Sequence, residues 1–413
     1  MARQELKVVS LGALGDGVTE QNIFVPGALP GEIVEAEIDK GRAYTVSLVQ
    51  KSSSRIEPVC QHFGDCGGCR VQHMDAELYA QWKVGLVSEA LSKVGIEIGL
   101  EPMIACAPHT RRRAVLSVVV KTDGVDVGFQ RANSNHVVAI EECHLLTKNL
   151  EVSRKVVGAL AQSFMPRGKT ASFTVLETQT GFDISVSTDA KIDDNSRRAI
   201  NAFAVKNKLA RVAINDEIIV ENMRPIIDLS GFAVSLPPGG FVQAAKSTEQ
   251  AMVKLVCDHL AKCKRVADIF SGSGTFALPL AQHSSVVAAE SEASALTALD
   301  RAWREAAGKG LKPVKTEKRD LHNRPLMAKE LDLMKTQGVV FDPPRAGAEM
   351  QSQQLAKSKV KRIAAVSCNP ITLARDLRIL IDGGYKLQSV TPLDQFLWSP
   401  HVEAVALLVR GKG

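Results

Sequence analysis

The stretch VADIFSGSGTFALPLA, residues 266–281, decides the fold class of this 413-residue chain. Its apolar beginning is typical of a buried strand, its middle is a glycine-rich turn, and its end is helical. Gly272 and Gly274 carry no side chain, so the backbone at the start of the helix can approach a ligand closely. A strand, a glycine turn and a helix in this order predict a cofactor-binding site, and either a dinucleotide or an adenosyl group would fit it.

The same alternation of strand and helix continues from about residue 236 to the C-terminus. The strand-like runs are RVADIF, SVVAAE, PVKTEKRD, GVVFDPP, RIAAVSC, YKLQSVTPLD and VEAVALLVR. Such regular alternation predicts a parallel, doubly wound α/β sheet. In sheets of this kind, ligands bind at the edge that is formed by the carboxyl ends of the strands.

Polar residues stand at that edge of the predicted sheet. Glu290 closes the second strand 16 residues after Gly274, where a carboxylate can bind two ribose hydroxyls. Asp342 lies in FDPPRAG, whose two prolines end the fourth strand and stiffen the backbone beyond the carboxylate. The five strands as a set end in Asp268, Glu290, Asp320, Asp342 and Cys368. We therefore expect one site at this edge.

Cys368 is the candidate nucleophile of this site. It lies in AAVSCNPITLARDL, residues 364–377, where Asn369 can cap the following helix and Pro370 suits its first turn. The positive end of a helix lowers the pKa of a nearby thiol, so we expect a reactive thiolate rather than a core cysteine. Glu403 begins the last strand, in WSPHVEAVALLVR. If that strand runs antiparallel, Glu403 lies at the same edge and is a candidate general base.

The N-terminal half predicts two further domains. Residues 1–55 carry short β-like runs broken by glycine, which predict a small β-barrel. Residues 56–235 hold a cysteine cluster and then mixed strands and helices, which indicate an α+β middle domain. A helix at about 75–95 belongs to this segment, and we expect it to pack on the catalytic domain. Residues 236–413 form the doubly wound domain.

The cysteine cluster predicts a metal centre. Cys60, Cys66 and Cys69 lie within ten residues, and the run GDCGGC lets the backbone wrap around a ligand. Three thiolates need a fourth ligand, for which Cys143 is the first candidate and Cys106 the rival. Spacing alone does not separate zinc from a [4Fe–4S] cluster. The cysteine pairs of zinc ribbons are missing, which favours iron–sulfur.

Composition and charge narrow the possible partners. No apolar run approaches the ~20 residues that a membrane span needs, and residues 1–9 lack the apolar core of a secretory signal. We therefore expect a cytoplasmic protein that does not engage a membrane. The formal net charge of +6 permits a polyanionic partner. Four arginines of the middle domain are candidates for binding the phosphates of such a partner, namely Arg111, Arg112, Arg113 and Arg131.

These features together resemble a known family. The segments that carry the resemblance are FVQ (241–243), DIFSGSGTF (268–276), FDPPRAG (341–347), SCNPITLARDL (367–377) and HVE (401–403). They are similar to the motifs of class I S-adenosylmethionine (SAM)-dependent RNA uracil-C5 methyltransferases. Within that family, the cysteine cluster and the N-terminal barrel, which resembles a TRAM or OB-like domain, point to the 23S rRNA 5-methyluridine methyltransferases. The resemblance covers nearly the whole chain.

The resemblance implies a role for each matching residue. Cys368 is implied as the nucleophile, Glu403 as the general base, and Asp342 as the carboxylate beside the cofactor and the target base. The implied SAM-binding residues are Gln243, Phe270, Thr275, Glu290, Asp320 and Asp342, and the implied [4Fe–4S] ligands are Cys60, Cys66, Cys69 and Cys143. Two segments depart from the family pattern. Ser271 and Thr275 replace a cysteine and an asparagine of the glycine loop, and DQFLWSPHVE lacks the usual Phe-Pro.

The expected activity is SAM-dependent methylation of C5 of a uridine in 23S rRNA by a monomeric enzyme. Attack of a thiolate at C6 makes C5 nucleophilic, and a base must then remove the C5 proton. The target base must first leave its stack in the folded RNA. Three alternatives stay open: a tRNA uridine C5 methyltransferase, an iron–sulfur RNA-binding protein with a vestigial methyltransferase site, and a nicotinamide oxidoreductase. The last of these gives no role to Cys368.

Overall fold

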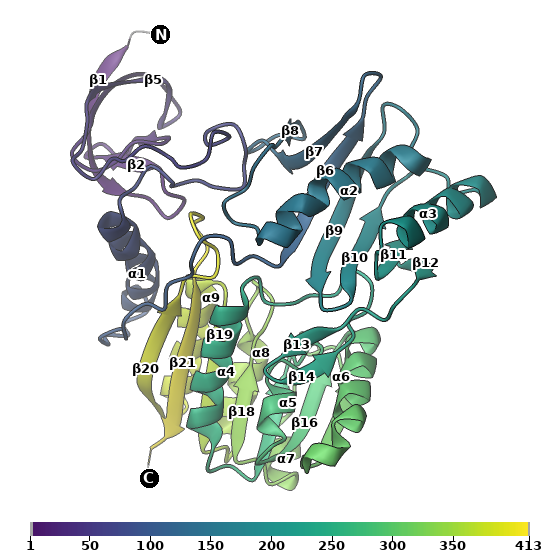
Figure 1. The fold of residues 1–413 in the computed structure, drawn as a ribbon. Helices are drawn as coiled ribbons and strands as arrows, with labels where there is room; N and C mark the ends of the chain where they lie inside the picture. The colour runs from purple at the N-terminus through teal and green to yellow at the C-terminus, as the bar shows by residue number, and fades with distance from the viewer. Residues whose placement is uncertain (1–2, 412–413) are drawn as a thin grey trace.

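The computed structural model describes residues 3–411 and confirms the doubly wound sheet in the C-terminal part of the chain (Figure 1). The sheet order is β17-β16-β15-β18-β19-β21-β20. Its strands are β15 (Arg265–Ile269), β16 (Ser285–Glu290), β17 (Val314–Lys318), β18 (Gly338–Phe341), β19 (Arg362–Ser367), β20 (Tyr385–Leu393) and β21 (Glu403–Arg410). β15 to β19 pair in parallel, whereas β21 runs antiparallel to β19 and β20. The chain reverses its order between β15 and β18, which is where such sheets bind ligands.

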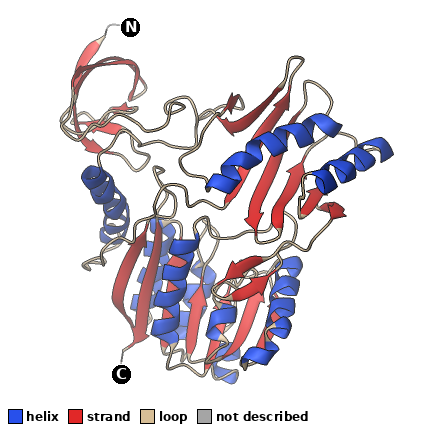
Figure 2. Ribbon diagram, viewed as in Figure 1, coloured by secondary structure: helices blue, strands red, loops and turns tan. Residues whose placement is uncertain are grey.

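Helices cover both faces of this sheet (Figure 2). One face carries α4 (Lys246–Leu260), α5 (Ala277–Leu280) and α6 (Ala293–Glu305), which is followed by the short η1 (Ala307–Lys309). The other face carries α7 (Ala328–Leu333), α8 (Glu349–Lys357) and α9 (Pro370–Asp382). The central strands β15, β18 and β19 are mostly apolar and buried, as packing on both sides requires.

Helix α1 (Ala76–Ser92), from the N-terminal half of the chain, packs on the catalytic domain. Asp75 begins it by accepting a hydrogen bond from the backbone N–H of Leu78 at 2.8 Å. Its apolar side chains Val87 and Leu91 join the same buried cluster as Leu377 of α9. Burial of each such side chain stabilises the fold by about 1.5–3 kcal/mol, which is enough to hold the helix there.

The middle domain is a second seven-stranded sheet, with the order β12-β11-β10-β9-β6-β7-β8. Its strands are β6 (Arg113–Val120), β7 (Val125–Gln130), β8 (Val137–Ala139), β9 (Thr170–Thr178), β10 (Gly181–Ser187), β11 (Arg211–Ile214) and β12 (Glu217–Glu221). α2 (Lys148–Phe164) and α3 (Asp194–Lys206) cover one face (Figure 2). In β6, Leu116 and Val118 are buried beneath the helices while Val115 is exposed. The opposite face is therefore open.

The N-terminal segment forms a closed five-stranded barrel of order β1-β2-β3-β5-β4. The strands are β1 (Gln4–Leu11), β2 (Gly17–Thr19), β3 (Phe24–Val25), β4 (Ile33–Asp39) and β5 (Arg42–Gln50). A small apolar core that includes Val8, Val25 and Val34 fills it. Between the middle sheet and α4, the hairpin of β13 (Ile227–Leu229) and β14 (Phe232–Val234) packs into the core of the C-terminal domain. No helix among residues 3–411 has the length and apolar character to cross a membrane.

Candidate active site

A cavity of about 860 Å³ opens at the carboxyl ends of the parallel strands, at the reversal of strand order. Every residue that we assigned to the nucleophile, the bases and the cofactor from sequence lies on its wall. These residues are Gln243, Phe270, Thr275, Glu290, Asp320, Asp342, Cys368 and Glu403. The structure thus brings together side chains from segments that are 160 positions apart in the chain.

The glycine loop has the backbone conformation that a close ligand requires. Gly272 and Gly274 have positive φ angles of 51° and 100°, and a Cβ on Gly274 would lie 2.5 Å from Cδ1 of Leu299. Phe270, just before them, also has a positive φ of 64°, which is uncommon for a residue with a side chain. The backbone N–H of Gly272 donates to Glu290 Oε2 at 3.0 Å, so the end of β16 holds the loop.

The two acidic residues after β16 and β17 are tied to their own loops. Glu290 accepts hydrogen bonds from the backbone N–H groups of Ser291 and Glu292. Asp320 accepts from the Asn323 side chain at 2.7 Å, and this contact holds the pKa of Asp320 below its usual range. Both carboxyl groups are therefore fixed at the cavity edge, where they can accept hydrogen bonds from hydroxyl or amino groups of a ligand.

Two glutamine side chains link the carboxyl groups of Asp342 and Glu403 through hydrogen bonds. Gln243 Nε2 donates to Asp342 Oδ2 at 3.1 Å. Gln395 Nε2 donates both to Gln243 Oε1 at 2.6 Å and to Glu403 Oε2 at 2.9 Å. Sequence reasoning missed Gln395, because a single polar residue between two strands carries no periodic or motif signal.

Burial controls the charge of these carboxyls. Burial raises the pKa of Asp342 to about 7, against the hydrogen bond from Gln243. Burial, and next the charge of Asp342, raise the pKa of Glu403 to about 8, against the hydrogen bond from Gln395. Asp268 lies beneath them and is fully buried, with neither carboxylate oxygen in a hydrogen bond of normal geometry. Burial raises its pKa to about 8. Perturbed carboxyls of this kind cluster at functional sites.

Cys368 follows β19, and Asn369 caps α9 by accepting from the backbone N–H of Ile371 at 3.1 Å, as expected. The prediction that the thiol of Cys368 has a low pKa is wrong. Burial, followed by the charges of Glu403 and Asp342, raises the pKa of Cys368 to about 11, and only Arg345 among nearby side chains acts in the opposite sense. The helix end is outweighed because the thiol is buried and, in addition, shares its pocket with two carboxyl groups.

Arg345 and His401 stand at the rim of the cavity beside Cys368. The Arg345 guanidinium lies 2.5 Å from Nδ1 of His401, and burial, followed by this positive charge, lowers the pKa of His401 to about 4. His401 is therefore neutral at physiological pH, whereas the positive charge of Arg345 acts to lower the pKa of Cys368. Both were missed as functional candidates, although Arg345 follows the Asp-Pro-Pro that marks Asp342.

The four predicted cluster cysteines line one small cavity of about 20 Å³, namely Cys60, Cys66, Cys69 and Cys143. Cys106, the rival fourth ligand, lies elsewhere, with its sulfur 2.9 Å from Thr110 Oγ1. Burial raises the pKa of Cys69 to about 12 and shifts the others upward. Among residues 3–411, no three His, Cys, Asp or Glu side chains are arranged to hold a metal ion. Four thiols are a donor set that either a zinc ion or a [4Fe–4S] cluster can use.

Two of the predicted phosphate-gripping arginines are already engaged within the protein. Arg112 is buried and pairs with Glu249 at 2.5 Å, and Arg113 donates to the carbonyls of Gly239 and Gly240. That expectation is wrong for both, because they join the middle domain to the segment that carries Gln243. Arg131 is exposed, and it pairs with Asp65.

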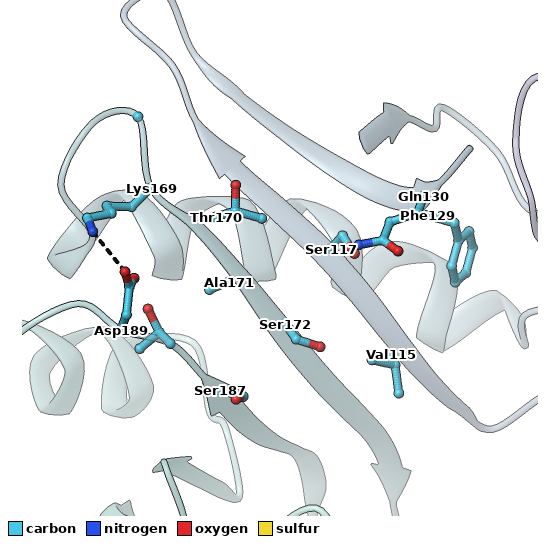
Figure 3. A pocket seen from close by; sticks show the side chains of 12 residues that line it. Val115, Ser117, Phe129, Gln130, Lys169, Thr170, Ala171, Ser172, Ser187 and Asp189 are labelled. Atoms are coloured by element: carbon cyan, nitrogen blue, oxygen red, sulfur yellow. Dashed lines mark hydrogen bonds and ion pairs between the residues drawn. The ribbon is translucent and has the colours of Figure 1, made fainter. Parts of the chain in front are cut away.

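A second cavity of about 760 Å³ lies on the open face of the middle sheet (Figure 3). Its walls carry the hydroxyls of Ser117, Thr170 and Ser172, and Lys169 there pairs with Asp189 at 2.9 Å. None of the residues expected to act in catalysis belongs to it. The residues expected from sequence to act in catalysis lie instead in the cavity at the carboxyl edge of the C-terminal sheet.

A solved structure shares this architecture over nearly its full length. The tRNA (uracil-54, C5)-methyltransferase of Pyrococcus abyssi, in complex with S-adenosyl-L-homocysteine, matches with a TM-score of 0.75. The match covers 98% of this chain and 100% of that one, at 21% sequence identity. The fold is thus that of the Rossmann-like SAM-dependent methyltransferases.

Sequence comparison identifies the family. The model of the tRNA (Uracil-5-)-methyltransferase family matches residues 109–411. An uncharacterized RNA methyltransferase of Mesorhizobium japonicum is 48% identical over 404 residues, which cover 97% of each chain. The 23S rRNA (uracil(1939)-C(5))-methyltransferase RlmD of Shewanella frigidimarina is 28% identical over 438 residues, covering 98% of this chain and 95% of the relative.

The chain belongs to the family of SAM-dependent RNA uracil-C5 methyltransferases. This confirms the resemblance seen in the sequence and the assignment as an RNA-modifying enzyme. It speaks against the nicotinamide oxidoreductase.

Proposed function

We propose that this enzyme methylates C5 of a uridine in 23S rRNA. The observation that carries the proposal is the single cavity in which Cys368, Asp342 and Glu403 face the glycine loop. Similarity to RlmD of Shewanella frigidimarina over almost the whole chain supports 23S rRNA as the substrate. A tRNA uridine is the second candidate, favoured by the family description and by the Pyrococcus abyssi structure.

The roles of the site residues follow from uracil chemistry. The thiolate of Cys368 adds to C6, and the electron pair of the C5–C6 double bond makes C5 nucleophilic. SAM supplies the methyl group and carries a positive sulfonium charge. After methyl transfer, the carboxylate of Glu403 takes the C5 proton, the C5–C6 double bond re-forms and the bond from C6 to sulfur breaks. Asp342 stays beside the reacting carbons, where the hydrogen bond from Gln243 holds it.

The cofactor-binding residues surround the glycine loop. We assign to SAM the cavity residues Gln243, Phe270, Thr275, Glu290, Asp320 and Asp342. The carboxylate of Glu290 suits ribose hydroxyls, and that of Asp320 suits an amino group of the adenine. The open backbone at Gly272 leaves room for the amino-acid end, because nothing lies within 4 Å of a Cβ built there.

We further propose that the four clustered cysteines hold a [4Fe–4S] cluster with a structural or RNA-contacting role. The four thiols share one cavity, and Arg111 lies close enough to Cys143 and Cys69 to interact with their charges. The cluster segment also contacts the loop before Glu403, because the backbone N–H of Arg70 donates to the carbonyl of Trp398 at 2.8 Å. Iron and sulfide analysis of the anaerobically purified protein, with Cys143→Ala as the variant, tests this assignment.

The three segments 1–55, 56–235 and 236–413 are proposed as a TRAM-like RNA-binding barrel, a cluster domain and a catalytic domain of a cytoplasmic enzyme. The closed five-stranded barrel supports the first assignment. Deletion of residues 1–55 is expected to weaken RNA binding while the cofactor still binds. Loss of cofactor binding in that deletion would contradict the division.

The substrate is tested with transcripts and methyl-labelled SAM. We expect 23S rRNA to be labelled by the wild-type enzyme and by Cys257→Ala, whose thiol lies outside the cavity, but not by Cys368→Ala. Label in tRNA alone would overturn the choice of rRNA. With Glu403→Gln, we expect a methylated covalent adduct to accumulate, detected as an added mass on the peptide that contains Cys368. Normal turnover of either site variant would contradict the mechanism.

A further inference from the structure

Gln395 is the one side chain that hydrogen-bonds to Glu403 in the described structure and also to a residue of the cofactor side of the cavity. It lies in the loop between β20 and β21, eight positions before Glu403. Its amide nitrogen has two hydrogens, and both are used: one reaches Glu403 Oε2 and the other reaches Gln243 Oε1. Gln395 is 3% exposed, so water does not offer an alternative partner to these groups.

The direction of the hydrogen bonds indicates which charge state is favoured. Gln395 donates to Glu403, and Gln243, which Gln395 orients, donates to Asp342. Each amide therefore presents N–H groups to a carboxylate. An N–H donor stabilises the ionised carboxylate and not the protonated one, so the chain opposes protonation at both ends. A side chain without N–H donors at position 395 would remove this hydrogen bond, and nothing in the described part of the chain would then oppose the effect of burial, which favours the protonated form of Glu403.

The charged groups that face Glu403 make this support necessary. Asp342, from the loop after β18, acts against ionisation of Glu403, and Cys368, at the end of β19, gains a negative charge during the reaction. Arg345 and His401 stand at the rim, but His401 is neutral and Arg345 acts on Cys368. Helix α4 contributes Thr248, whose hydroxyl lies 3.5 Å from Gln395 Oε1. No positive group among these partners contacts Glu403.

The loop that carries Gln395 is itself fixed from outside the catalytic domain. Lys83 of α1 is fully buried and pairs with Asp394, the neighbour of Gln395, at 2.9 Å. Tyr79 donates to the other oxygen of Asp394 at 2.6 Å. In Figure 1 this loop, in yellow, extends from the ends of β20 and β21 towards the N-terminal part of the chain. Gln395 is thus held in one position before any substrate enters.

We propose that Gln395 is a positioning residue that aims Glu403 at the C5 proton and favours the ionised form of its carboxylate in the proton-removal step. The inference rests on the proposed function, because it needs Glu403 to be the base. Gln395 then acts after methyl transfer and not in the addition of the thiolate to C6. It sets the pH below which the methylated adduct can no longer be resolved.

The first test compares pH profiles of turnover for Gln395→Met and the wild-type enzyme. Loss of one hydrogen bond to an ionised group moves its pKa by about one unit or more. We therefore expect the acidic limb of the kcat profile to move up by about one pH unit, and turnover at pH 7 to fall about tenfold. The matched control is Gln351→Met, which removes a buried amide that contacts only the backbone of Leu326. It should leave the profile unchanged.

The second test separates proton removal from the earlier steps with RNA that contains 5-fluorouridine. Fluorine at C5 cannot leave as a cation, so the covalent adduct forms with its methyl group and then persists. We expect Gln395→Met to trap this RNA at the wild-type rate although it turns over uridine RNA slowly. Trapping slowed as much as turnover, or an unshifted pH profile, would overturn the proposal.

A failure of the proposed function gives a different result. If the wild-type enzyme neither methylates uridine RNA nor traps the fluorinated RNA through Cys368, the function itself is wrong. If wild type does both and Gln395→Met equals wild type, only the role of Gln395 is wrong. Should Gln395→Met not fold, Gln395→Glu keeps the side-chain length. Gln395→Glu is also expected to move the acidic limb of the kcat profile to higher pH, because a third carboxyl group then shares the pocket with Asp342 and Glu403.

Discussion

Cys368 lies beside a helix N-terminus, yet its pKa is raised to about 11. A helix end contributes about 0.3–1 kcal/mol to a nearby charge, which is less than one pKa unit at about 1.4 kcal/mol. Burial together with the charges of Glu403 and Asp342 exceeds that contribution. The thiolate therefore depends on a positive charge that enters the pocket, and a bound sulfonium has that charge.

The reactivity of Cys368 is expected to depend on the charge of the cofactor. Alkylation by iodoacetamide should be slow at pH 8 in the free enzyme and should rise as the pH approaches 11. SAM should accelerate alkylation at pH 8 relative to S-adenosyl-L-homocysteine, which fills the same space without the positive charge. Peptide mass spectrometry measures the rate at Cys368 itself. Equal rates with both ligands would show that the cofactor charge does not reach the thiol.

Gly274 is expected to tolerate no side chain. A Cβ there would lie 2.5 Å from Leu299, and the φ of 100° disfavours any other residue. Gly274→Ala should lower the free energy of unfolding by about 1–3 kcal/mol, because both strain and overpacking oppose it. Gly124→Ala is the control, since nothing lies within 4 Å of a Cβ at that position. Urea denaturation measures both, and equal stability of the two variants would contradict the prediction.

At the scale of elements, α1 connects the N-terminal half of the chain to the loop that precedes Glu403. Its Lys83 pairs with Asp394 and also donates to the carbonyl of His401. Burial lowers the pKa of Lys83, and Asp394 opposes this shift. The helix thereby fixes both ends of the loop between β20 and β21. A long helix was predictable from its periodicity, whereas its partner loop was not, because a contact between residues 83 and 394 leaves no local pattern.

Lys83→Met is therefore expected to be strongly destabilising. It leaves the buried carboxylate of Asp394 without its charged partner, which costs about 3–5 kcal/mol. Lys254→Met breaks an exposed pair with Asp258 and should leave the free energy of unfolding almost unchanged. The free energy of unfolding in urea distinguishes the two. A loss for Lys83→Met no larger than that for Lys254→Met would mean that the buried pair is not needed to hold the loop.

At the scale of the whole molecule, buried carboxyls couple stability to pH. The pKa values of Asp268 and Glu403 are raised to about 8 and that of Asp342 to about 7, so the folded chain holds protons that the unfolded chain has released. Their stabilising contribution is complete below about pH 4 and is lost as the pH rises through 7 and 8. His73 and His401 have lowered pKa values and act in the opposite sense, but only below pH 6.5.

The free energy of unfolding should accordingly fall between pH 6.5 and 8. Each carboxyl that is still protonated contributes a slope of up to about 1.4 kcal/mol per pH unit. Asp268→Asn removes one of these groups and should flatten the dependence. Denaturant unfolding of the wild-type protein and of Asp268→Asn at several pH values measures the pH dependence of the free energy of unfolding. A free energy that stays constant or rises across this window would contradict the raised pKa values.

The local chemistry of the sequence determined the doubly wound sheet, the glycine loop and the side chains at the strand ends, because strand and helix periodicity and turn residues are local properties. It also indicated Cys368 and Glu403, since both stand at the ends of predicted strands. Only the tertiary structure decided the raised pKa of Cys368, the engagement of Arg112 and Arg113 within the protein, and the link from Gln395 to Glu403. Burial, charge and side-chain contacts between separate elements or across a loop arise only when the chain is folded, and no local sequence pattern specifies them.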